Sequence, residues 1–482
     1  MNPIAILIDF GSTFTKVVAV DLTNAQVAGR SQAPSTVLTD VREGLLQALV
    51  SLHERRALFD RRPSTLDVLQ GRFTLAASSA AGGLRIGVIG NVPGLTVEAA
   101  NQAALGAGAK VVGSMSFKLP DDASQEIESW RPDMILLTGG TDGGDSATIL
   151  HNARALARSR LRVPIVVAGN QAVAGQVCDM LERSGNDVRF AGNVMPRPGE
   201  LAVESAREEI RKLFMERIIR AKGLDKLQGI VPVVLPTPVA VLDGVRIGAE
   251  GVESEPGWGD MLVVDVGGAT TDVHSIGYGQ PSGPQIVQQG LPEPYAKRTV
   301  EGDLGIRFNA GTLLERVGAN EFENEFRAGF PQFHISAAQI TRYIEQISQE
   351  TARLPVQAWH DAVDAQLARV AVDLALERHV GKKERIVTRE GEAWMYYGKD
   401  MSETRTIIGT GGVFMYNSNV RHILSVGGRG KASSQILRPK NPRVFIDSSY
   451  LLYAVGLLSQ SCRDVAARLF RRYMNEIIPA PS

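Results

Sequence analysis

A short pattern occurs twice in this chain and constrains its fold more than any other feature. Each copy is an apolar run that ends in an aspartate, followed by a glycine turn with hydroxyl residues. The copies are IAILIDFGSTFTKVVAVD at residues 4–21 and MLVVDVGGATTDVH at residues 261–274. An apolar run that ends at glycine predicts a strand and then a turn whose backbone lies where side chains would not fit. Two such turns, far apart in the chain, predict two lobes with a nucleotide between them.

Both turns carry groups that bind phosphate. Backbone N–H groups of a glycine turn converge on one point, and hydroxyl groups add further donors. Aspartates would be repelled by phosphate, so we expect Asp9 and Asp265 to hold Mg²⁺ instead, directly or through water. The predicted nucleotide-binding residues of the two turns are Gly11, Ser12, Thr13, Lys16, Gly267, Gly268, Thr270 and Thr271. For either copy alone, a structural hairpin is the alternative, and Lys16 could be an ordinary exposed lysine.

The pair DFGSTFTK and DVGGATTD resembles the two phosphate loops of the superfamily of actin, heat-shock chaperones and sugar kinases. Three further segments are similar to that superfamily and occur in its order. These are LPTPVAVLDG at 235–244, similar to the start of the connecting helix, IIGTGGVFMYN at 407–417, similar to the adenosine loop, and FIDSSYLLYAVGLL at 445–458, similar to the returning helix. The resemblance implies a two-lobed actin-like (ribonuclease H-like) α/β ATPase with ATP and Mg²⁺ as cofactors. It also implies nucleotide binding by Gly409, Thr410, Gly411 and Gly412.

One position departs from the superfamily pattern. In heat-shock chaperones a glutamate at the start of the connecting helix helps to place the attacking water, but Leu235 stands at the matching position. The glutamine of actin has no match either. Asp9 and Asp272 then become the candidates to orient that water, and Asp265 completes the predicted catalytic set. Because phosphoryl transfer depends on positioning and charge neutralisation, we expect slow hydrolysis.

A closer resemblance covers nearly the whole chain of 482 residues. KRTVEGDLGIR at 297–307, LLTGGTDGG at 136–144 and the IIGTGG loop together resemble the accessory proteins of methylaspartate (glutamate) mutase, the family called GlmL or MutL. This family is distinct from the DNA mismatch-repair protein of the same name. The resemblance implies an ATP-dependent reactivating chaperone that releases damaged cofactor from an adenosylcobalamin-dependent mutase or aminomutase. The expected partners are the subunits of that mutase, and a homodimer is left open.

Residues 84–195 differ in pattern from the sequence around them. Strand-like runs such as MILL at 134–137 alternate with helical patterns at intervals of roughly 25 residues, which is typical of a parallel sheet covered on both faces. We therefore expect an inserted, doubly wound, flavodoxin-like domain, whose strand-end loops at 90–94, 138–144 and 168–170 would face a ligand or the mutase. The Asp-x-His-x-x-Gly ligand sequence of the cobalamin domains is absent. A phosphate-binding or purely structural loop at 139–144 is the alternative.

The expected organisation has five parts. Residues 1–83 begin the N-terminal actin-like lobe, 84–195 form the insert, 196–260 contain a linker, a helix and the connecting segment, 261–440 form the C-terminal lobe with the adenosine loop, and 441–482 contain the returning helices. Within the C-terminal lobe, Asp303 is expected to cap a helix that begins at about Ile306. Residues 384–400 are ambiguous and could form a hairpin.

Composition excludes several classes of function. The 52 basic and 52 acidic residues balance without a basic arm, so the chain offers no electrostatic footprint for nucleic acid or an anionic membrane. Two cysteines, Cys178 and Cys462, are too few for a disulfide framework or structural zinc, and for the iron–sulfur cluster of the dehydratase activators in this superfamily. With no apolar run near the roughly 18 residues of a membrane span, and a first strand that follows Met1 directly, we expect a cytoplasmic protein.

Two other functions within the superfamily stay open. A small-metabolite kinase needs a carboxylate base beside an acceptor hydroxyl, and no segment marks such a pocket. An actin-like scaffold ATPase of the cell-division or pilus type would be expected to carry a membrane anchor or a polymer interface. The basic amphipathic helix predicted at 464–478 is a weak candidate for such an anchor, since its length and position favour a docked terminal helix.

Overall fold

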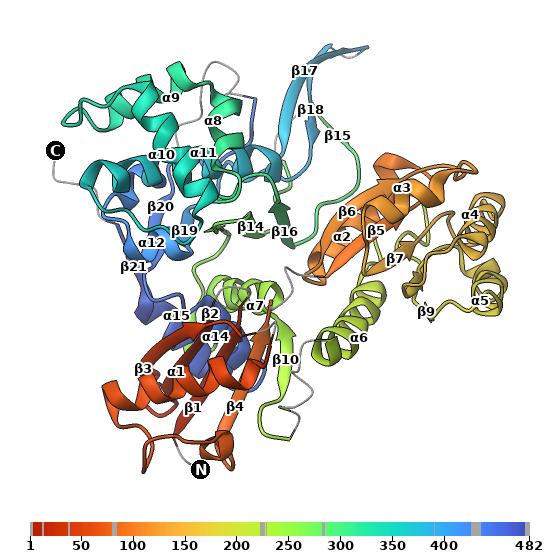
Figure 1. Ribbon diagram of the computed structural model, residues 1–482. Helices are drawn as coiled ribbons and strands as arrows, with labels where there is room; N and C mark the ends of the chain where they lie inside the picture. Colours follow the sequence, from red (N-terminus) through yellow and green to blue (C-terminus); the bar gives the residue numbers. More distant parts are fainter. Residues whose placement is uncertain are drawn as a thin grey trace. The chain divides into compact units, whose positions relative to one another are not determined.

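The computed structural model describes residues 3–11, 14–36, 39–79, 84–221, 227, 229–281, 285–389, 391–425 and 435–477. The chain divides into two compact units. The first comprises Met1–Ile247, Gly290–Pro294 and Tyr453–Leu469, and the second comprises Gly248–Gln289, Tyr295–Leu452 and Phe470–Ser482. Figure 1 shows the helices and strands of both units.

The first unit contains a five-stranded mixed sheet with the order β10-β4-β1-β2-β3. Its strands are β1 (Ile4–Phe10), β2 (Phe14–Asp21), β3 (Gln26–Pro34), β4 (Phe73–Ser78) and β10 (Val233–Pro236). Strands β1, β2 and β3 form an antiparallel meander, whereas β4 runs parallel to β1 and β10 runs parallel to β4. Helix α1 (Val41–Arg56) begins after Asp40, whose side chain accepts a hydrogen bond from the Arg42 N–H, and buries Leu45 and Leu49 in the core of this sheet. A short 3₁₀ helix, η1 (Leu66–Leu69), precedes β4.

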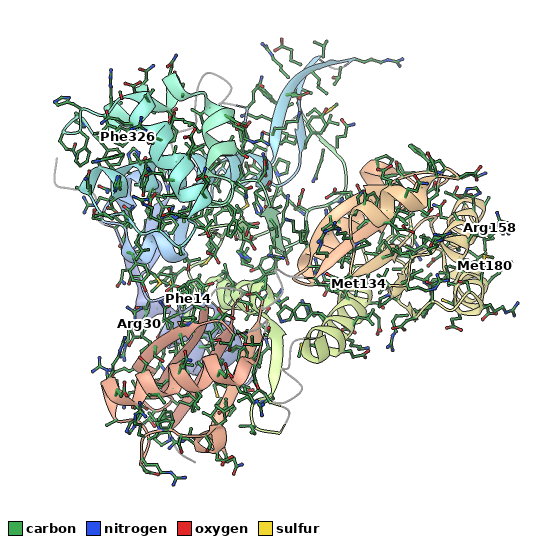
Figure 2. The ribbon with its side chains drawn as sticks, in the orientation of Figure 1. Phe14, Arg30, Met134, Arg158, Met180 and Phe326 are labelled. Atoms are coloured by element: carbon green, nitrogen blue, oxygen red, sulfur yellow. The ribbon has the colours of Figure 1, made fainter. Side chains whose placement is uncertain are left out.

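The insert contains a fully parallel sheet with the order β6-β5-β7-β8-β9. Its elements are β5 (Arg85–Ile89), η2 (Pro93–Val97), α2 (Glu98–Gly106), β6 (Lys110–Met115), α3 (Ala123–Ser129), β7 (Met134–Leu137), α4 (Ala147–Arg158), β8 (Ile165–Val167), η3 (Gln171–Val173), α5 (Ala174–Arg183) and β9 (Val188–Phe190). Successive residues of β7 enter different cores: Met134 (Figure 2) packs on the face covered by α2, and Ile135 packs on the face covered by α3, α4 and α5. The insert is therefore doubly wound, as predicted.

Helix α6 (Glu204–Ala221) follows the last strand of the insert. Its residues Ile210, Leu213 and Phe214 belong to the same buried cluster as α2 and β5. Apolar side chains at this spacing lie on one helical face, which explains how α6 packs against the insert. The boundary of the insert at residue 195 stays a prediction.

The second unit contains a mixed sheet with the order β16-β14-β13-β19-β20-β21. Its strands are β13 (Met261–Val266), β14 (Thr271–Ile276), β16 (Ala296–Glu301), β19 (Thr406–Thr410), β20 (Arg443–Asp447) and β21 (Met474–Glu476). Helices α8 (Ala310–Val317), α9 (Ala319–Gly329), α10 (Ala337–Gln349), α11 (Ala358–His379), α12 (Gly412–Tyr416) and α13 (Val420–Ile423) complete its core, in which Phe326 (Figure 2) is buried. A smaller sheet consists of β15 (Ile286–Gln289), β18 (Gly391–Tyr397) and β17 (Lys382–Thr388).

Five strands of each mixed sheet share one topology, and the second sheet adds β21 antiparallel to β20. In each, the first two strands form an antiparallel hairpin, the third strand pairs with the second, and two later strands add in parallel beside the first. Strand β1 therefore corresponds to β13, β2 to β14 and β4 to β19. This is the ribonuclease H-like order of the actin-like ATPases. The predicted fold class, a two-lobed actin-like α/β fold with an inserted doubly wound domain, is confirmed.

The other elements of the described residues are helices α7 (Thr237–Glu250), α14 (Leu452–Ser459) and α15 (Arg463–Tyr473), and strands β11 (Gly251–Val252) and β12 (Glu255–Pro256), which pair in a short ribbon. The predicted terminal helix at 464–478 was too long, because α15 ends at Tyr473 and β21 then pairs with β20. The predicted hairpin at 384–400 is confirmed by β17 and β18. Among the described residues, no helix is both long enough and apolar enough to cross a membrane.

Asp303 does not cap a helix, which corrects the sequence prediction. Helix α8 begins at Ala310, directly after Asn309, and not near Ile306. The intervening residues cannot start the helix because their backbone packs against the second glycine turn: a Cβ atom at Gly305 would lie 2.3 Å from the carbonyl carbon of Ala269. The Asp303 carboxylate accepts hydrogen bonds from Arg378 and Arg316 instead.

Candidate functional site

In the first unit, Asp9 lies at the end of β1 with only 1% of its surface exposed. One carboxylate oxygen accepts a hydrogen bond from the Thr237 hydroxyl at 2.6 Å, and the other lies 3.4 Å from the Lys16 ammonium. Asp9 and Lys16 occupy opposite positions in the β1–β2 register. A buried carboxylate needs such partners, because it has lost its hydration shell. Lys16 is thus a partner of Asp9 and not an ordinary exposed lysine.

Gly11 follows β1 in a turn that requires glycine. Its N–H donates to the Phe14 carbonyl at 3.1 Å, and a Cβ atom there would lie 2.7 Å from the same oxygen. The Ser35 hydroxyl donates to the Gly11 carbonyl at 2.8 Å and holds the turn from the side of β3. Ser12 and Thr13, predicted to bind phosphate, lie outside the described residues.

In the second unit, Asp265 lies at the corresponding end of β13. The sheet places Asp272 of β14 opposite it on one side and Thr410 of β19 opposite it on the other. The loop after β19 turns back against it, because a Cβ atom at Gly411 would lie 2.4 Å from the Val266 carbonyl oxygen and 2.8 Å from a carboxylate oxygen of Asp265. The structure thus brings the predicted second phosphate loop and the predicted adenosine loop together.

The glycine turn between β13 and β14 is held from behind by the segment that leads into α8. The Gly267 N–H donates to the Thr270 carbonyl at 2.9 Å and closes the turn. The Gly267 carbonyl accepts a hydrogen bond from the Ile306 N–H at 3.1 Å, and the Gly268 carbonyl accepts one from the Arg307 N–H at 2.9 Å. The KRTVEGDLGIR segment is therefore a support for the turn, built from backbone hydrogen bonds.

Three predicted binding residues, Thr271, Thr410 and Gly409, make internal contacts at the place where a side chain would reach a ligand. The Thr271 hydroxyl is buried and donates to the Leu304 carbonyl at 2.7 Å. The Thr410 hydroxyl donates to the buried Asp447 at 3.2 Å. Gly409 lies within β19, and a Cβ atom there would lie 2.5 Å from the Phe414 ring. If these residues contact a nucleotide, as predicted, they do so through their backbone groups.

Gly412 and Asp447 complete this end of the second sheet. Gly412 is the first residue of α12, and a Cβ atom there would have no neighbour within 4 Å. Asp447, at the end of β20, accepts hydrogen bonds from the N–H groups of Leu451 and Leu452. Burial raises the pKa of the Asp447 carboxyl, and these N–H donors oppose that rise.

Asp272 is fixed on both carboxylate oxygens. The Thr270 hydroxyl donates to one oxygen at 3.3 Å, and the Arg298 guanidinium donates to the other through two nitrogens at 3.1 and 2.7 Å. Next to this pair, burial lowers the pKa of His274 to about 3, with the Arg298 charge as a second cause. The imidazole of His274 is therefore neutral near pH 7.

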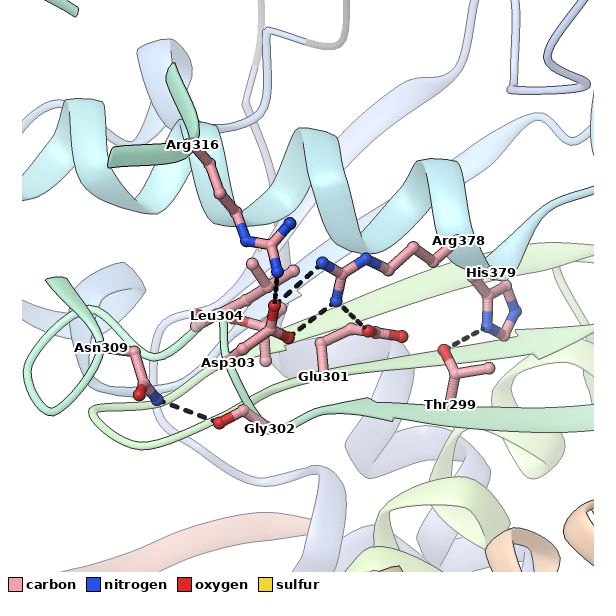
Figure 3. A network of polar contacts seen from close by, with 10 residues as sticks. Thr299, Glu301, Gly302, Asp303, Leu304, Asn309, Arg316, Arg378 and His379 are labelled. Atoms are coloured by element: carbon pink, nitrogen blue, oxygen red, sulfur yellow. Dashed lines mark hydrogen bonds and ion pairs between the residues drawn. The ribbon is translucent and has the colours of Figure 1, made fainter. Parts of the chain in front are cut away.

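An ionic network ties the same segment to α11 (Figure 3). Arg378 donates to Glu301 at 2.5 Å and to Asp303 at 2.7 Å, and Arg316 of α8 donates to Asp303 at 2.6 Å. The hydrogen bond from Arg378 lowers the pKa of Asp303 to about 2, whereas burial raises the pKa of Glu301. At neutral pH the network therefore fastens β16 and its following turn to a helix of the core.

The donors near Asp9 and Asp265 are hard oxygen atoms, which suits Mg²⁺. Mg²⁺ is usually held by one or two carboxylates, several waters and substrate phosphates, so one aspartate in each loop is sufficient. Among the described residues there is no group of three or more His, Cys, Asp or Glu side chains that could hold a metal. A metal that requires a complete protein cage, such as structural Zn²⁺, does not fit this donor set.

Thr237 and Arg378 were not among the residues predicted from the sequence. The Pro-Thr-Pro of residues 236–238 carried a signal for Thr237, because a proline at the second helical position marks a helix start and makes the preceding threonine a polar group at that start. For Arg378 no local signal exists, since its partners are 75 and 77 positions away.

Comparison with known proteins gives one family over nearly the whole chain. A family model described as MutL protein matches residues 5–474. Protein MutL of Clostridium tetanomorphum is 40% identical over 475 residues, which cover 98% of this chain and 99% of that protein.

Two solved structures are similar at much lower identity. The gluconate kinase from Lactobacillus acidophilus is 10% identical with a TM-score of 0.34, covering 98% of this chain and 93% of its own. A glycerol dehydratase reactivase is 10% identical with a TM-score of 0.32, covering 95% and 99%. At these TM-scores the two structures add nothing to the fold described above.

Proposed function

Since the chain belongs to the MutL family, we propose that it is an ATP-dependent accessory protein that reactivates an adenosylcobalamin-dependent mutase. The observation that supports nucleotide chemistry most strongly is the repeated sheet. At the same strand end of both sheets stands an aspartate, Asp9 or Asp265, followed by a tight glycine turn. The mutase as client, glutamate mutase or a related aminomutase, follows from the sequence resemblance to the GlmL and MutL accessory proteins.

In this proposal Asp9 and Asp265 hold Mg²⁺ through its water ligands, because each carboxylate already has protein neighbours. When bound, Mg²⁺ neutralises negative charge on the phosphates. Lys16 adds a point charge, the glycine turns offer backbone N–H groups, and Asp272 orients the attacking water. That both loops bind one and the same triphosphate stays a prediction.

Turnover in this proposal is slow. Leu235 lies in β10 where the chaperones carry a glutamate, so one positioning group is missing. Loss of one positioning group reduces a phosphoryl transfer that depends on alignment without removing it. Slow hydrolysis suits a cycle in which ATP binding and release change the conformation of the two lobes and the mutase then exchanges its damaged cofactor.

The nucleotide site is tested with Asp9→Asn, which keeps the shape of the side chain and removes its charge. We expect Mg²⁺-dependent ATP hydrolysis to fall at least about 100-fold, because a charged Mg²⁺ partner is lost. Asp21→Asn is the matched control, since Asp21 lies at the opposite end of the same hairpin and pairs in register with Ile4. Normal hydrolysis by Asp9→Asn would show that the site is assigned wrongly.

The client is tested by incubating an inactivated adenosylcobalamin-dependent mutase with this protein, ATP, Mg²⁺ and fresh cofactor. Recovery of mutase activity only when ATP is hydrolysable supports the proposal. Robust phosphorylation of a sugar, polyol or carboxylic acid would instead favour the metabolite kinase, and ATP-dependent filaments would favour the scaffold ATPase. Cytoplasmic location and a homodimer stay predictions, which fractionation and sedimentation would test.

A further inference from the structure

The two hairpins that carry the predicted phosphate loops differ at one register position. In the first unit, the residue opposite Asp9 is Lys16, so an acid faces a base. In the second unit, the residue opposite Asp265 is Asp272, so two acids face each other. Like charges at directly opposite positions destabilise a strand pair. The second hairpin therefore needs a cation from elsewhere in the fold.

Strand β16 supplies that cation. Arg298 lies opposite His274 in the β14–β16 register, two residues from the position opposite Asp272. Arg298 and Asp272 are therefore diagonal neighbours on adjacent strands, and the Arg298 guanidinium donates to one carboxylate oxygen of Asp272 at 2.7 Å. Both side chains are largely withdrawn from water, with 5% of Arg298 and 16% of Asp272 exposed. At such low exposure the contact is far less screened than a surface ion pair.

The backbone of β16 cannot shift easily away from Asp272. The segment directly after β16 is bound to the second glycine turn and the start of β14. Its Leu304 carbonyl accepts a hydrogen bond from the Thr271 hydroxyl, and its Asn309 amide donates to the Ala269 carbonyl at 2.8 Å. On the other side, Arg378 of α11 holds Glu301 at the end of the strand. Arg298 is thus presented to Asp272 from a strand that is fastened at its end to both the glycine turn and the core helix.

From this geometry we propose that Arg298 is a positioning residue for ATP hydrolysis, which holds the Asp272 carboxylate in the orientation needed to align the attacking water. The inference rests on the proposed function. With Thr270 on one oxygen and Arg298 on the other, Asp272 has a fixed direction. Alignment of this kind strengthens catalysis because misplacement of a reacting group by about 1 Å costs up to about 100-fold in rate.

A double-mutant cycle tests whether Arg298 acts through Asp272. The variants are Arg298→Met, Asp272→Asn and the two combined, with kcat for ATP and the Kd of ATP measured for each. We expect Arg298→Met to lower kcat about 10- to 100-fold with little change in Kd. In the Asp272→Asn background the same change should cost less than about threefold, because the group that it positions is already absent. Arg298→Lys, which restores a charge from the same strand, should recover part of kcat.

Arg438→Met is the matched control for loss of a buried ion pair. Arg438 donates to Asp373 of α11 at 3.0 Å, and the pair is as withdrawn from water as that of Arg298 and Asp272. This variant should lower the unfolding temperature to a degree similar to Arg298→Met while kcat stays within about twofold of wild type, since no aligned group is disturbed.

The outcomes separate the inference from the function on which it rests. A wild-type chain that hydrolyses ATP, with equal and additive losses from Arg298→Met in both backgrounds, overturns the positioning role alone. Equal losses of kcat in Arg298→Met and Arg438→Met overturn it as well, because a general loss of stability then explains both. A wild-type chain without ATP hydrolysis overturns the proposed function and this inference together.

Discussion

Replacing Gly411 by alanine should destabilise the second unit far more than replacing its neighbour Gly412. Gly411 has φ 106° and ψ 170°, a backbone region that is almost restricted to glycine and costs other residues about 1–3 kcal/mol. Its new Cβ atom would also lie 2.4 Å from the Val266 carbonyl oxygen. Forced overpacking of this kind costs about 1–3 kcal/mol. The two effects together predict a loss of about 2–6 kcal/mol in the free energy of unfolding.

Gly412 provides the control because it differs from Gly411 in both respects. It is the first residue of α12 and has no neighbour within 4 Å of an added Cβ atom. Since alanine is the better helix former, Gly412→Ala should change stability by less than about 1 kcal/mol, in the stabilising direction. Adjacent positions with the same chemical change thus have expected effects of opposite sign.

The assay is urea unfolding followed by tryptophan fluorescence. Three of the four tryptophans, Trp258, Trp359 and Trp394, belong to the second unit, so the signal reports mainly on the unit that carries the substitution. Gly411→Ala should also impair Mg²⁺-dependent ATP hydrolysis, because the added atom would lie 2.8 Å from a carboxylate oxygen of Asp265. An unfolding midpoint of Gly411→Ala equal to that of wild type would refute the packing of this loop against β13.

Two further predictions concern a hydrogen bond and a buried imidazole. Thr237→Val removes the 2.6 Å hydrogen bond to the buried Asp9 and should cost about 1.5–3 kcal/mol of unfolding free energy, whereas Thr237→Ser keeps the hydroxyl and should cost less; calorimetry on both variants checks this. Because burial lowers the pKa of His274 to about 3, the folded chain takes up this proton later than the unfolded chain, whose histidine pKa is about 6.5. The stability from neutral His274 is therefore fully present above about pH 6.5 and decreases as the pH falls toward 3, by up to about 1.4 kcal/mol per pH unit. His274→Leu should flatten this decline in urea unfolding, and a variant of the exposed His334 should not.

The sequence predicted the elements whose signal is local. The apolar runs before Asp9 and Asp265 identified β1 and β13, and the alternation in residues 84–195 identified a parallel sheet covered on both faces. These signals lie within a few residues of the structure that they specify. The actin-like fold class itself followed from the resemblance of these segments, in their order along the chain, to the ATPase superfamily.

The side-chain partners of the candidate site could not be predicted in the same way. Thr237 binds Asp9 across 228 positions, and Arg298 binds Asp272 through a strand pairing whose register no local pattern fixes. Asp303 shows the opposite error: its position before a helical pattern suggested a cap, but Gly305 packs against Ala269, the chain then forms turns at 306–309, and the helix begins only after Asn309. Tertiary packing overrode a favourable local sequence at this point.

The packing of α6 on the insert decides how a deletion variant must be made. Excising only residues 84–195 would strip the cover from Ile210, Leu213 and Phe214 and leave an apolar stripe in water, which favours aggregation. The cut should therefore remove the whole of α6 as well. Since β4 and β10 are parallel neighbours, the replacement must span from the end of one strand back to the start of the next, which takes about a dozen residues. Only with such a shortened protein would loss of mutase binding report on the insert and not on aggregation of the variant.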